Sequence, residues 1–151
     1  TDLIYFGLVP NKSGHLTNPI PRATLIKLQS IKQQSDCRLL LSVGGWDRSN
    51  GFAELTSSPL TRQLFIRNLV QYCRQNGFHG IDYDWEHPKT KIELSNYVKL
   101  ITETAFGNDG AKQMPDFPYR DTSLGNEGAK QMTDFPHKLY TTGYLPEPLI
   151  N

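Results

Sequence analysis

The chain has 151 residues, the size of one ordinary domain, and 37% hydrophobic with 21% charged residues is the composition of a globular protein. Its 16 Lys and Arg residues and 15 Asp and Glu residues give a net charge of +1, which excludes the strong basic charge typical of proteins that bind nucleic acid or anionic membranes. No apolar run approaches the roughly 20 residues that a membrane helix needs. We therefore expect neither a nucleic-acid partner nor a membrane partner.

The start of the chain and its cysteines leave the cellular compartment open. Thr1 leads straight into an apolar run, so the sequence shows no signal peptide, and both a removed leader and a fragment of a longer chain remain open. Cys37 and Cys73 are the only cysteines, and their separation fits neither a metal knuckle nor a redox pair. Two buried free thiols are expected rather than a disulfide.

Strands and amphipathic helices alternate along the first two thirds of the chain. Three segments rich in β-branched and aromatic residues predict buried strands, and three segments with apolar residues at helical spacing predict helices. Ser58, Pro59 and Gly77 mark the ends of the middle helix. This alternation predicts an α/β fold of parallel strands joined by right-handed crossovers. In chain order the predicted elements are strand 2–10, helix 22–34, strand 38–46, helix 58–76, strand 78–86 and helix 90–106.

The sequence changes character after residue 106. Residues 107–120 recur as residues 125–138, and both copies are rich in Gly, Pro and Asp. Two copies do not make a solenoid, so a recent local duplication is favoured over a functional repeat. One late strand is predicted at residues 137–145. The chain therefore divides into an α/β unit, residues 1–106, and a tail, residues 107–151.

The predicted strand FHGIDYDWE contains three acids, Asp82, Asp84 and Glu86, at every second position. Alternate side chains of a strand share one face and lie about 7 Å apart. The acids are therefore expected on the face away from the helices, and the apolar residues between them on the helix-covered face. Glu86 would lie nearest the carboxyl end of the strand, where parallel α/β folds place their active sites.

Three neighbouring carboxylates in a partly dry site cannot all ionise cheaply, so at least one is expected to keep its proton at neutral pH. A protonated carboxyl group at the mouth of a sheet can act as a general acid. Two alternatives are a solvated acidic edge strand and a hard-metal site with His79 or His87. The flanking apolar residues disfavour the first, and the absence of calcium-loop spacing disfavours the second.

Two motifs together resemble the signatures of the family 18 glycoside hydrolases, the chitinases and their relatives. The catalytic strand of that family has the pattern Asp-x-x-Asp-x-Asp-x-Glu, and Asp82, Asp84 and Glu86 match its last three acids. The Ser-x-Gly-Gly signature of the family matches residues 42–45, which Trp46 follows. The two motifs come in the right order with one helix between them, and the resemblance covers roughly residues 1–105.

The resemblance implies a (β/α)8 barrel that cleaves β-1,4-linked N-acetylglucosamine polymers, such as chitin, by a retaining, substrate-assisted mechanism without a cofactor or a metal. Glu86 would protonate the glycosidic oxygen, and the N-acetyl group of the substrate would attack its own anomeric carbon. Asp84 would orient that group and share a proton with Asp82 and Glu86. Trp46 would stack on a sugar ring, with core packing as the alternative. The implied ligand is chitin or a chitooligosaccharide, and the implied location is extracellular (secreted).

The chain departs from the family pattern at its first acid and in its length. His79 stands where the pattern has its first acid, and would either pair with Asp82 or pack. A complete barrel needs about 250 residues, so residues 1–106 predict an incomplete (β/α)8 barrel, the N-terminal and central part of a truncated catalytic domain. Two alternatives to an active enzyme follow: a chitinase-like carbohydrate-binding protein, or an inactive fragment.

Overall fold

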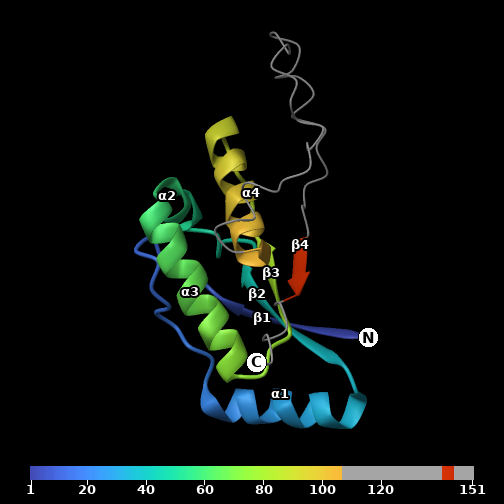
Figure 1. Cartoon of the computed structure of the whole chain (residues 1–151). Coiled ribbons are helices and arrows are strands. Elements are labelled where there is room, and N and C mark those ends of the chain that lie inside the picture. The colour runs from blue at the N-terminus through green and yellow to red at the C-terminus, as the bar shows by residue number, and fades with distance from the viewer. Residues whose placement is uncertain (107–140, 145–151) are drawn as a thin grey trace, which may run out of the picture.

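The computed structural model of the chain describes residues 1–106 and 141–144. It contains a four-stranded sheet in the order β1-β2-β3-β4, with helices packed against one face (Figure 1). The elements are β1 (Asp2–Leu8), α1 (Arg22–Ser35), β2 (Arg38–Gly44), α2 (Phe52–Ser57), α3 (Pro59–Gln75), β3 (Gly80–Asp84), α4 (Lys91–Phe106) and β4 (Thr141–Tyr144).

The first three strands are parallel neighbours, as the alternation of elements predicts. β1 pairs with β2, and β2 pairs with β3, each in parallel register. The predicted helix 58–76 corresponds to α3 and forms part of the crossover between β2 and β3. The sequence did not predict α2, because a helix of six residues is too short to show an apolar period. The result is a partial (β/α) barrel.

The late strand is antiparallel to its neighbour in the sheet. A barrel strand would lie parallel to its neighbour, but β4 pairs with β3 in antiparallel register, with Asp82 opposite Thr142. A strand does form within the predicted segment 137–145, at Thr141–Tyr144, but its direction is not that of a barrel strand. The edge of β3 offers unpaired backbone N–H and C=O groups, and a short segment can pair with such an edge in either direction.

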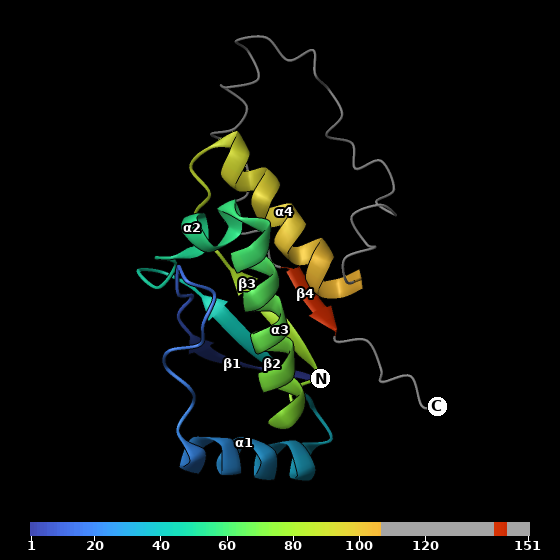
Figure 2. The same cartoon turned by 60° about the vertical axis from the view of Figure 1, so that its left-hand side comes forward.

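The hydrophobic core lies on the helix side of the sheet. Alternate residues of β2, Leu39, Leu41 and Val43, are fully buried there. All four helices that are described contribute to the same core, and α3 lies across β2 and β3 (Figure 2). Burial of this apolar surface is the main stabilising term for the fold. The helix residues in the core are Leu28, Phe52, Leu55, Phe65, Leu69, Cys73, Tyr97 and Leu100.

Both cysteines are buried and free, as predicted. Burial raises the pKa of the Cys73 thiol to about 12, so this thiol is unreactive at neutral pH. Among the described residues, no helix is long and apolar enough to cross a membrane. The predicted repeat at 107–138 lies outside the residues that the structure describes.

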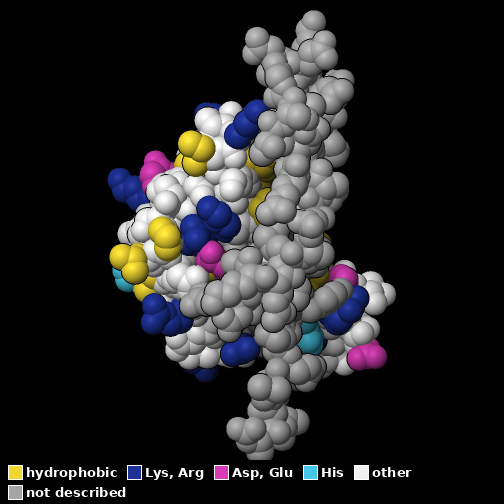
Figure 3. Space-filling view, turned by 45° about the horizontal axis from the view of Figure 1, so that its top comes forward, with side chains coloured by type: hydrophobic (Ala, Val, Ile, Leu, Met, Phe, Trp, Pro, Cys, Tyr) yellow, Lys and Arg dark blue, Asp and Glu magenta, His cyan; other side chains and the backbone are white. Residues whose placement is uncertain are grey.

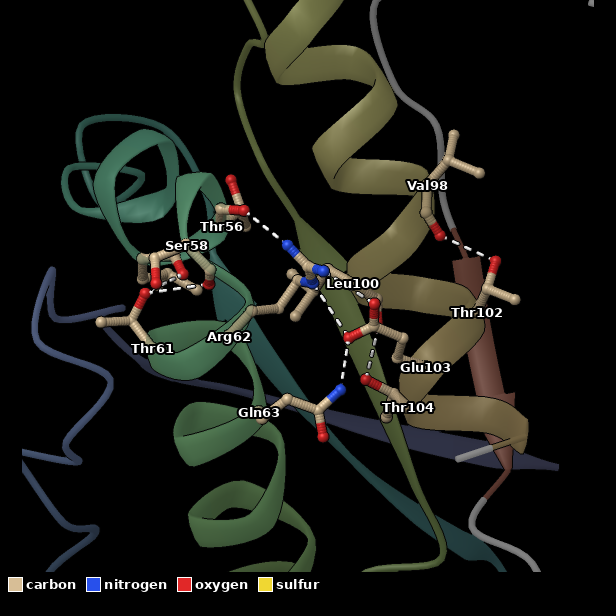
Figure 4. A network of polar contacts seen from close by, with 11 residues as sticks. Thr56, Ser58, Thr61, Arg62, Gln63, Val98, Leu100, Thr102, Glu103 and Thr104 are labelled. Atoms are coloured by element: carbon tan, nitrogen blue, oxygen red, sulfur yellow. Dashed lines mark hydrogen bonds and ion pairs between the residues drawn. The ribbon is translucent and has the colours of Figure 1, made fainter. Parts of the chain in front are cut away.

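A buried ion pair joins α3 to α4, and a further hydrogen bond joins α3 to α2 (Figure 4). The Arg62 guanidinium in α3 donates two hydrogen bonds to the Glu103 carboxylate in α4, at 2.9 and 2.8 Å. It donates a third, of 2.8 Å, to the carbonyl oxygen of Thr56 at the end of α2. Gln63 also donates to Glu103, at 2.9 Å. The two charges are therefore compensated within the helix layer, where both side chains are almost fully buried.

We expect Glu103→Gln to lower the free energy of unfolding by about 3–5 kcal/mol, because it leaves the Arg62 guanidinium buried without a counter-charge. The side chains of Arg62 and Glu103 are only 6% and 8% exposed. The matched control is Asp2→Asn in the Arg38–Asp2 pair, whose side chains are 52% and 30% exposed, and which should cost about 0–1 kcal/mol. Urea denaturation measures both, and equal losses would contradict the assignment.

Candidate active site

β3 divides its side chains between two environments. On the helix side, the Tyr83 hydroxyl lies 2.9 Å from the Thr104 hydroxyl of α4. Trp85 continues this side and stacks on Phe52 of α2, with ring centroids 5.2 Å apart. Asp82 and Asp84 alternate with these residues and therefore lie on the face away from the helices, as the spacing predicts.

The three acids become more exposed along the chain. Asp82 is only 5% exposed, whereas Asp84 at the end of β3 and Glu86 beyond it are half-buried. The prediction that all three lie in one strand is wrong for Glu86, because β3 ends at Asp84 and strand alternation no longer sets the direction of its side chain. The acids lead from the buried centre of the sheet to the surface at its carboxyl end.

The Gly-Gly turn after β2 brings the ends of two strands together. Gly44 and Gly45 have φ values of 103° and 106°, a conformation that side chains disfavour. A Cβ atom on Gly44 would clash with the carbonyl oxygen of Asp84, and one on Gly45 would clash with the Phe6 ring. Without those atoms, the Gly45 N–H donates a 2.7 Å hydrogen bond to the Asp84 carbonyl oxygen. The turn therefore fixes the backbone between the second and third acids.

Ser49 is a residue of this site that the sequence did not reveal. Its hydroxyl oxygen accepts a 2.9 Å hydrogen bond from the Glu86 N–H. The same hydroxyl lies 3.1 Å from the carbonyl oxygens of Gly45 and Asp84 and can donate to either. One side chain thus ties the loop after β2 to the backbone on both sides of Trp85. Its only sequence signal is a hydroxyl residue near a Gly-Gly turn, which does not predict a contact with a residue 37 positions away.

Trp46 lies at the rim of the sheet, directly after the Gly-Gly turn. It is 72% exposed and does not pack in the core of the described residues. Phe6, at the end of β1, is 52% exposed, and the Arg48 guanidinium lies 5.5 Å from the centre of its ring. Arg48 also donates a 2.7 Å hydrogen bond to the Gly7 carbonyl oxygen. The carboxyl edge of the sheet therefore presents two aromatic side chains to solvent.

His79 is held by the backbone of β2 at the amino end of β3. Its Nδ1 atom accepts a 3.0 Å hydrogen bond from the Leu39 N–H, so packing, rather than pairing with Asp82, is the alternative that the structure supports. Burial lowers the pKa of His79 below its ordinary value, and the positive charge of Lys32 lowers it further. Accepting the Leu39 N–H also requires an unprotonated Nδ1.

Charged side chains are dispersed over the face of the described molecule that Figure 3 draws. On the face drawn in Figure 3, Lys and Arg side chains lie in several separate groups, with hydrophobic and acidic side chains between them. Within residues 1–106 and 141–144, no three His, Cys, Asp or Glu side chains gather as metal ligands would. The acids at the end of β3 are therefore the group to compare with known proteins.

The fold and these motifs resemble those of one family of barrel proteins. The sequence model of "Glycosyl hydrolases family 18" matches residues 4–117, and the chain belongs to this family. It is 39% identical over 70 residues to "Chitinase 1" of Aphanocladium album, an alignment that covers 46% of this chain and 16% of that protein. The chain spans about one fifth or less of the length of such curated relatives.

Two solved structures share the fold over most of the chain. A chitinase from Rhizomucor miehei is 26% identical and superposes with a TM-score of 0.63, covering 68% of this chain and 36% of the chitinase chain. Human YKL-39, a pseudo-chitinase with retained chitooligosaccharide binding properties, is also 26% identical, with a TM-score of 0.60 and coverages of 76% and 33%. Both similarities support the partial-barrel description of the fold.

We expect Ser49→Ala to speed hydrogen exchange at the Glu86 amide by about tenfold, because this N–H loses its acceptor and a hydrogen bond contributes about 0.5–1.5 kcal/mol. Exchange at the Leu94 amide, which bonds to the Thr90 carbonyl oxygen within 3.0 Å, should not change. NMR-detected exchange measures both amides. Ser49→Thr keeps the hydroxyl and should restore protection, whereas unchanged exchange in Ser49→Ala would contradict the contact.

Below pH 6.5, the ordinary pKa of His79, we expect the free energy of unfolding to fall. The unfolded chain binds a proton at this residue before the folded chain does, so folding loses stability from pH 6.5 down to the lower pKa of the folded state. His79→Asn keeps an acceptor for the Leu39 N–H but cannot titrate, and should flatten this part of the profile. Denaturation at several pH values measures the effect. The exposed His15, changed to Gln, is the control and should keep the slope of the parent.

Proposed function

We propose that the chain provides the acid-bearing part of a chitinase-type glycoside hydrolase, whose substrate is a β-1,4-linked N-acetylglucosamine polymer. The observation that supports this most directly is the series of acids at the end of β3 in a partial barrel: Asp82 and Asp84 lie on the face away from the helices, and Glu86 follows directly after the strand. Membership of family 18 supports the same reaction class. Residues 1–106 hold the catalytic segment, and residues 107–151 are its tail.

The mechanism is retaining and assisted by the substrate. Glu86, half-buried at the rim, donates its proton to the glycosidic oxygen as the bond to the leaving sugar breaks. The oxygen of the N-acetyl group attacks the anomeric carbon of its own sugar, so the protein supplies no nucleophile. Water then opens the cyclic intermediate, and Glu86 takes back a proton. Both displacements occur at one carbon, so its configuration is retained.

Asp84 and Asp82 support that step electrostatically. Asp84 holds the N-acetyl group in position and stabilises the positive charge that develops on it. Asp82, which is nearly buried, shares a proton with Asp84, because neighbouring carboxylates in a partly dry site do not all ionise cheaply. Gly45 and Ser49 bind the Asp84 carbonyl oxygen, and Ser49 binds the Glu86 N–H, so they act as positioning groups for the two acids.

Trp46 is the proposed sugar platform. A 72% exposed indole at the rim of the site offers a flat apolar face on which a pyranose ring can stack. Chitin is an extracellular polymer, and an enzyme that degrades it acts outside the cell. The protein is therefore proposed to be secreted.

A chitooligosaccharide-binding protein without turnover is the second candidate. It is favoured by the similarity to human YKL-39, which binds chitooligosaccharides as a pseudo-chitinase. A site with only three parallel strands among the described residues also surrounds a sugar less completely than a closed barrel does. Sugar contact through Trp46 would remain in that case, and only the proton transfer from Glu86 would be lost.

We expect Glu86→Gln to lower the turnover of a chromogenic chitooligosaccharide by about 10²–10⁴, because glutamine keeps the shape of the side chain but has no proton to donate. Asp84→Asn should also be harmful, and His79→Asp, which restores the family pattern, should not reduce activity. The assay compares a substrate that bears the N-acetyl group with one that lacks it, and only the former should be cleaved.

Glu54→Gln is the matched control, since this exposed carboxylate on α2 lies outside the site. It should leave turnover unchanged. An active parent that Glu86→Gln does not impair would refute the assignment of the acid. A parent that binds chitooligosaccharide without cleaving it would favour the binding protein, and a parent that does neither would refute both candidates.

A further inference from the structure

The loop between β1 and α1 contains a triplet with chemistry that the proposed hydrolase does not use. Residues Asn11, Lys12 and Ser13 form an Asn-x-Ser sequence in which the middle residue is not proline, and no other Asn in the 151 residues is followed by such a pattern. This triplet is the acceptor sequence for N-linked glycosylation of secreted proteins. Any N-linked sugar on this chain would therefore be attached at one position.

The triplet forms a turn that holds the Asn11 amide by its oxygen. The Asn11 Oδ1 atom accepts hydrogen bonds of 2.9 Å from both the Ser13 N–H and the Ser13 hydroxyl. The Gly14 N–H donates to the Asn11 carbonyl oxygen, at 2.9 Å, and closes the turn. All the hydrogen bonds of the Asn11 side chain are thus made by its oxygen, and its Nδ2 atom takes no part in them.

The nitrogen that would react is open to solvent. Lys12 and Ser13 are exposed and Asn11 is half-buried. Its Nδ2 atom makes no hydrogen bond with the described residues. The atom is also not buried, so it reaches water. An oligosaccharide bound there can extend outward without displacing the loop.

We propose that Asn11 is a site of N-linked glycosylation, an inference that rests on the secreted location proposed above. The donor is an oligosaccharide linked through pyrophosphate to a lipid. The Nδ2 atom of Asn11 attacks C1 of the first sugar, and the bond between C1 and the pyrophosphate oxygen breaks. The lipid pyrophosphate leaves with the electron pair, and the amide nitrogen loses one proton. Nothing is oxidised or reduced.

The modified residue would lie at the same edge of the sheet as the acids. β1 ends at Leu8, and the loop that follows starts at the carboxyl edge. The loop packs on Gly51, where a Cβ atom would lie 2.5 Å from the Pro10 carbonyl oxygen and 3.0 Å from the Lys12 nitrogen. Gly51 ends the loop that begins with Trp46. An oligosaccharide on Asn11 therefore stands beside the rim, where a long polymer would approach.

The test expresses the full chain behind a cleavable secretion signal in eukaryotic cells and analyses both the medium and the cell lysate. Peptide N-glycosidase in ¹⁸O-labelled water converts a glycosylated Asn into ¹⁸O-labelled Asp, and mass spectrometry of the peptide locates the label. We expect the label at residue 11 and a downward gel shift on digestion. No sugar substrate of the proposed hydrolase is used, so the result is independent of its activity.

Variants of the acceptor triplet test whether the label depends on the Asn-x-Ser sequence. Asn11→Gln and Ser13→Ala should each abolish the label and the gel shift, whereas Ser13→Thr should keep both. Asn18→Gln, an exposed Asn in the same loop followed by proline, should behave as the parent. Unlabelled Asn11 in parent protein from both fractions would overturn the proposal, as would a label that persists in Ser13→Ala. Because the sugar is added to the chain as it is made, poor folding of a variant does not obscure the result.

Discussion

The close approach of the ends of β2 and β3 is the constraint on which the site depends. It exists because Gly44 and Gly45 have no side chains where the Asp84 carbonyl oxygen and the Phe6 ring lie. Both glycines also have a positive φ, so any other residue would be strained there even if space were made. The Gly-Gly motif is thus required by backbone geometry. The position of the acids therefore depends on β2 as well as on β3, the strand that carries them.

The helix side of β3 is held by aromatic side chains. Trp85 stacks on Phe52 and contacts Tyr97 edge-on, with centroids 5.2 and 5.4 Å apart. The Tyr97 hydroxyl donates a 2.6 Å hydrogen bond to the Tyr83 carbonyl oxygen. The backbone between Asp82 and Glu86 is therefore fixed from the helix layer by Tyr97 and from the loop by Ser49. A carboxylate that must meet a substrate atom within hydrogen-bond distance needs this kind of support.

The sequence predicted the elements with a long apolar pattern and the faces of the strand. The three parallel strands, the three long helices and the position of Asp82 on the face away from the helices follow from period and alternation alone. Contacts between distant residues could not be predicted in this way. Ser49 bonds to a residue 37 positions away, and β4 pairs with a strand about 60 positions earlier in the chain, in a direction that its own sequence does not encode. His79 was ambiguous because its partner is a backbone N–H of another strand, which has no sequence signal.

The two tryptophans of the chain lie in opposite environments, which gives the molecule two separate optical probes. Trp85 is 8% exposed and stacked in the aromatic cluster, so its emission should be blue-shifted and shielded from dissolved quenchers until the helix layer opens. Trp46 is 72% exposed, so its emission should be red-shifted and readily quenched by iodide. Fluorescence can therefore follow the loss of the core and the occupation of the rim in one sample. Collisional quenching would separate the two signals without any added label.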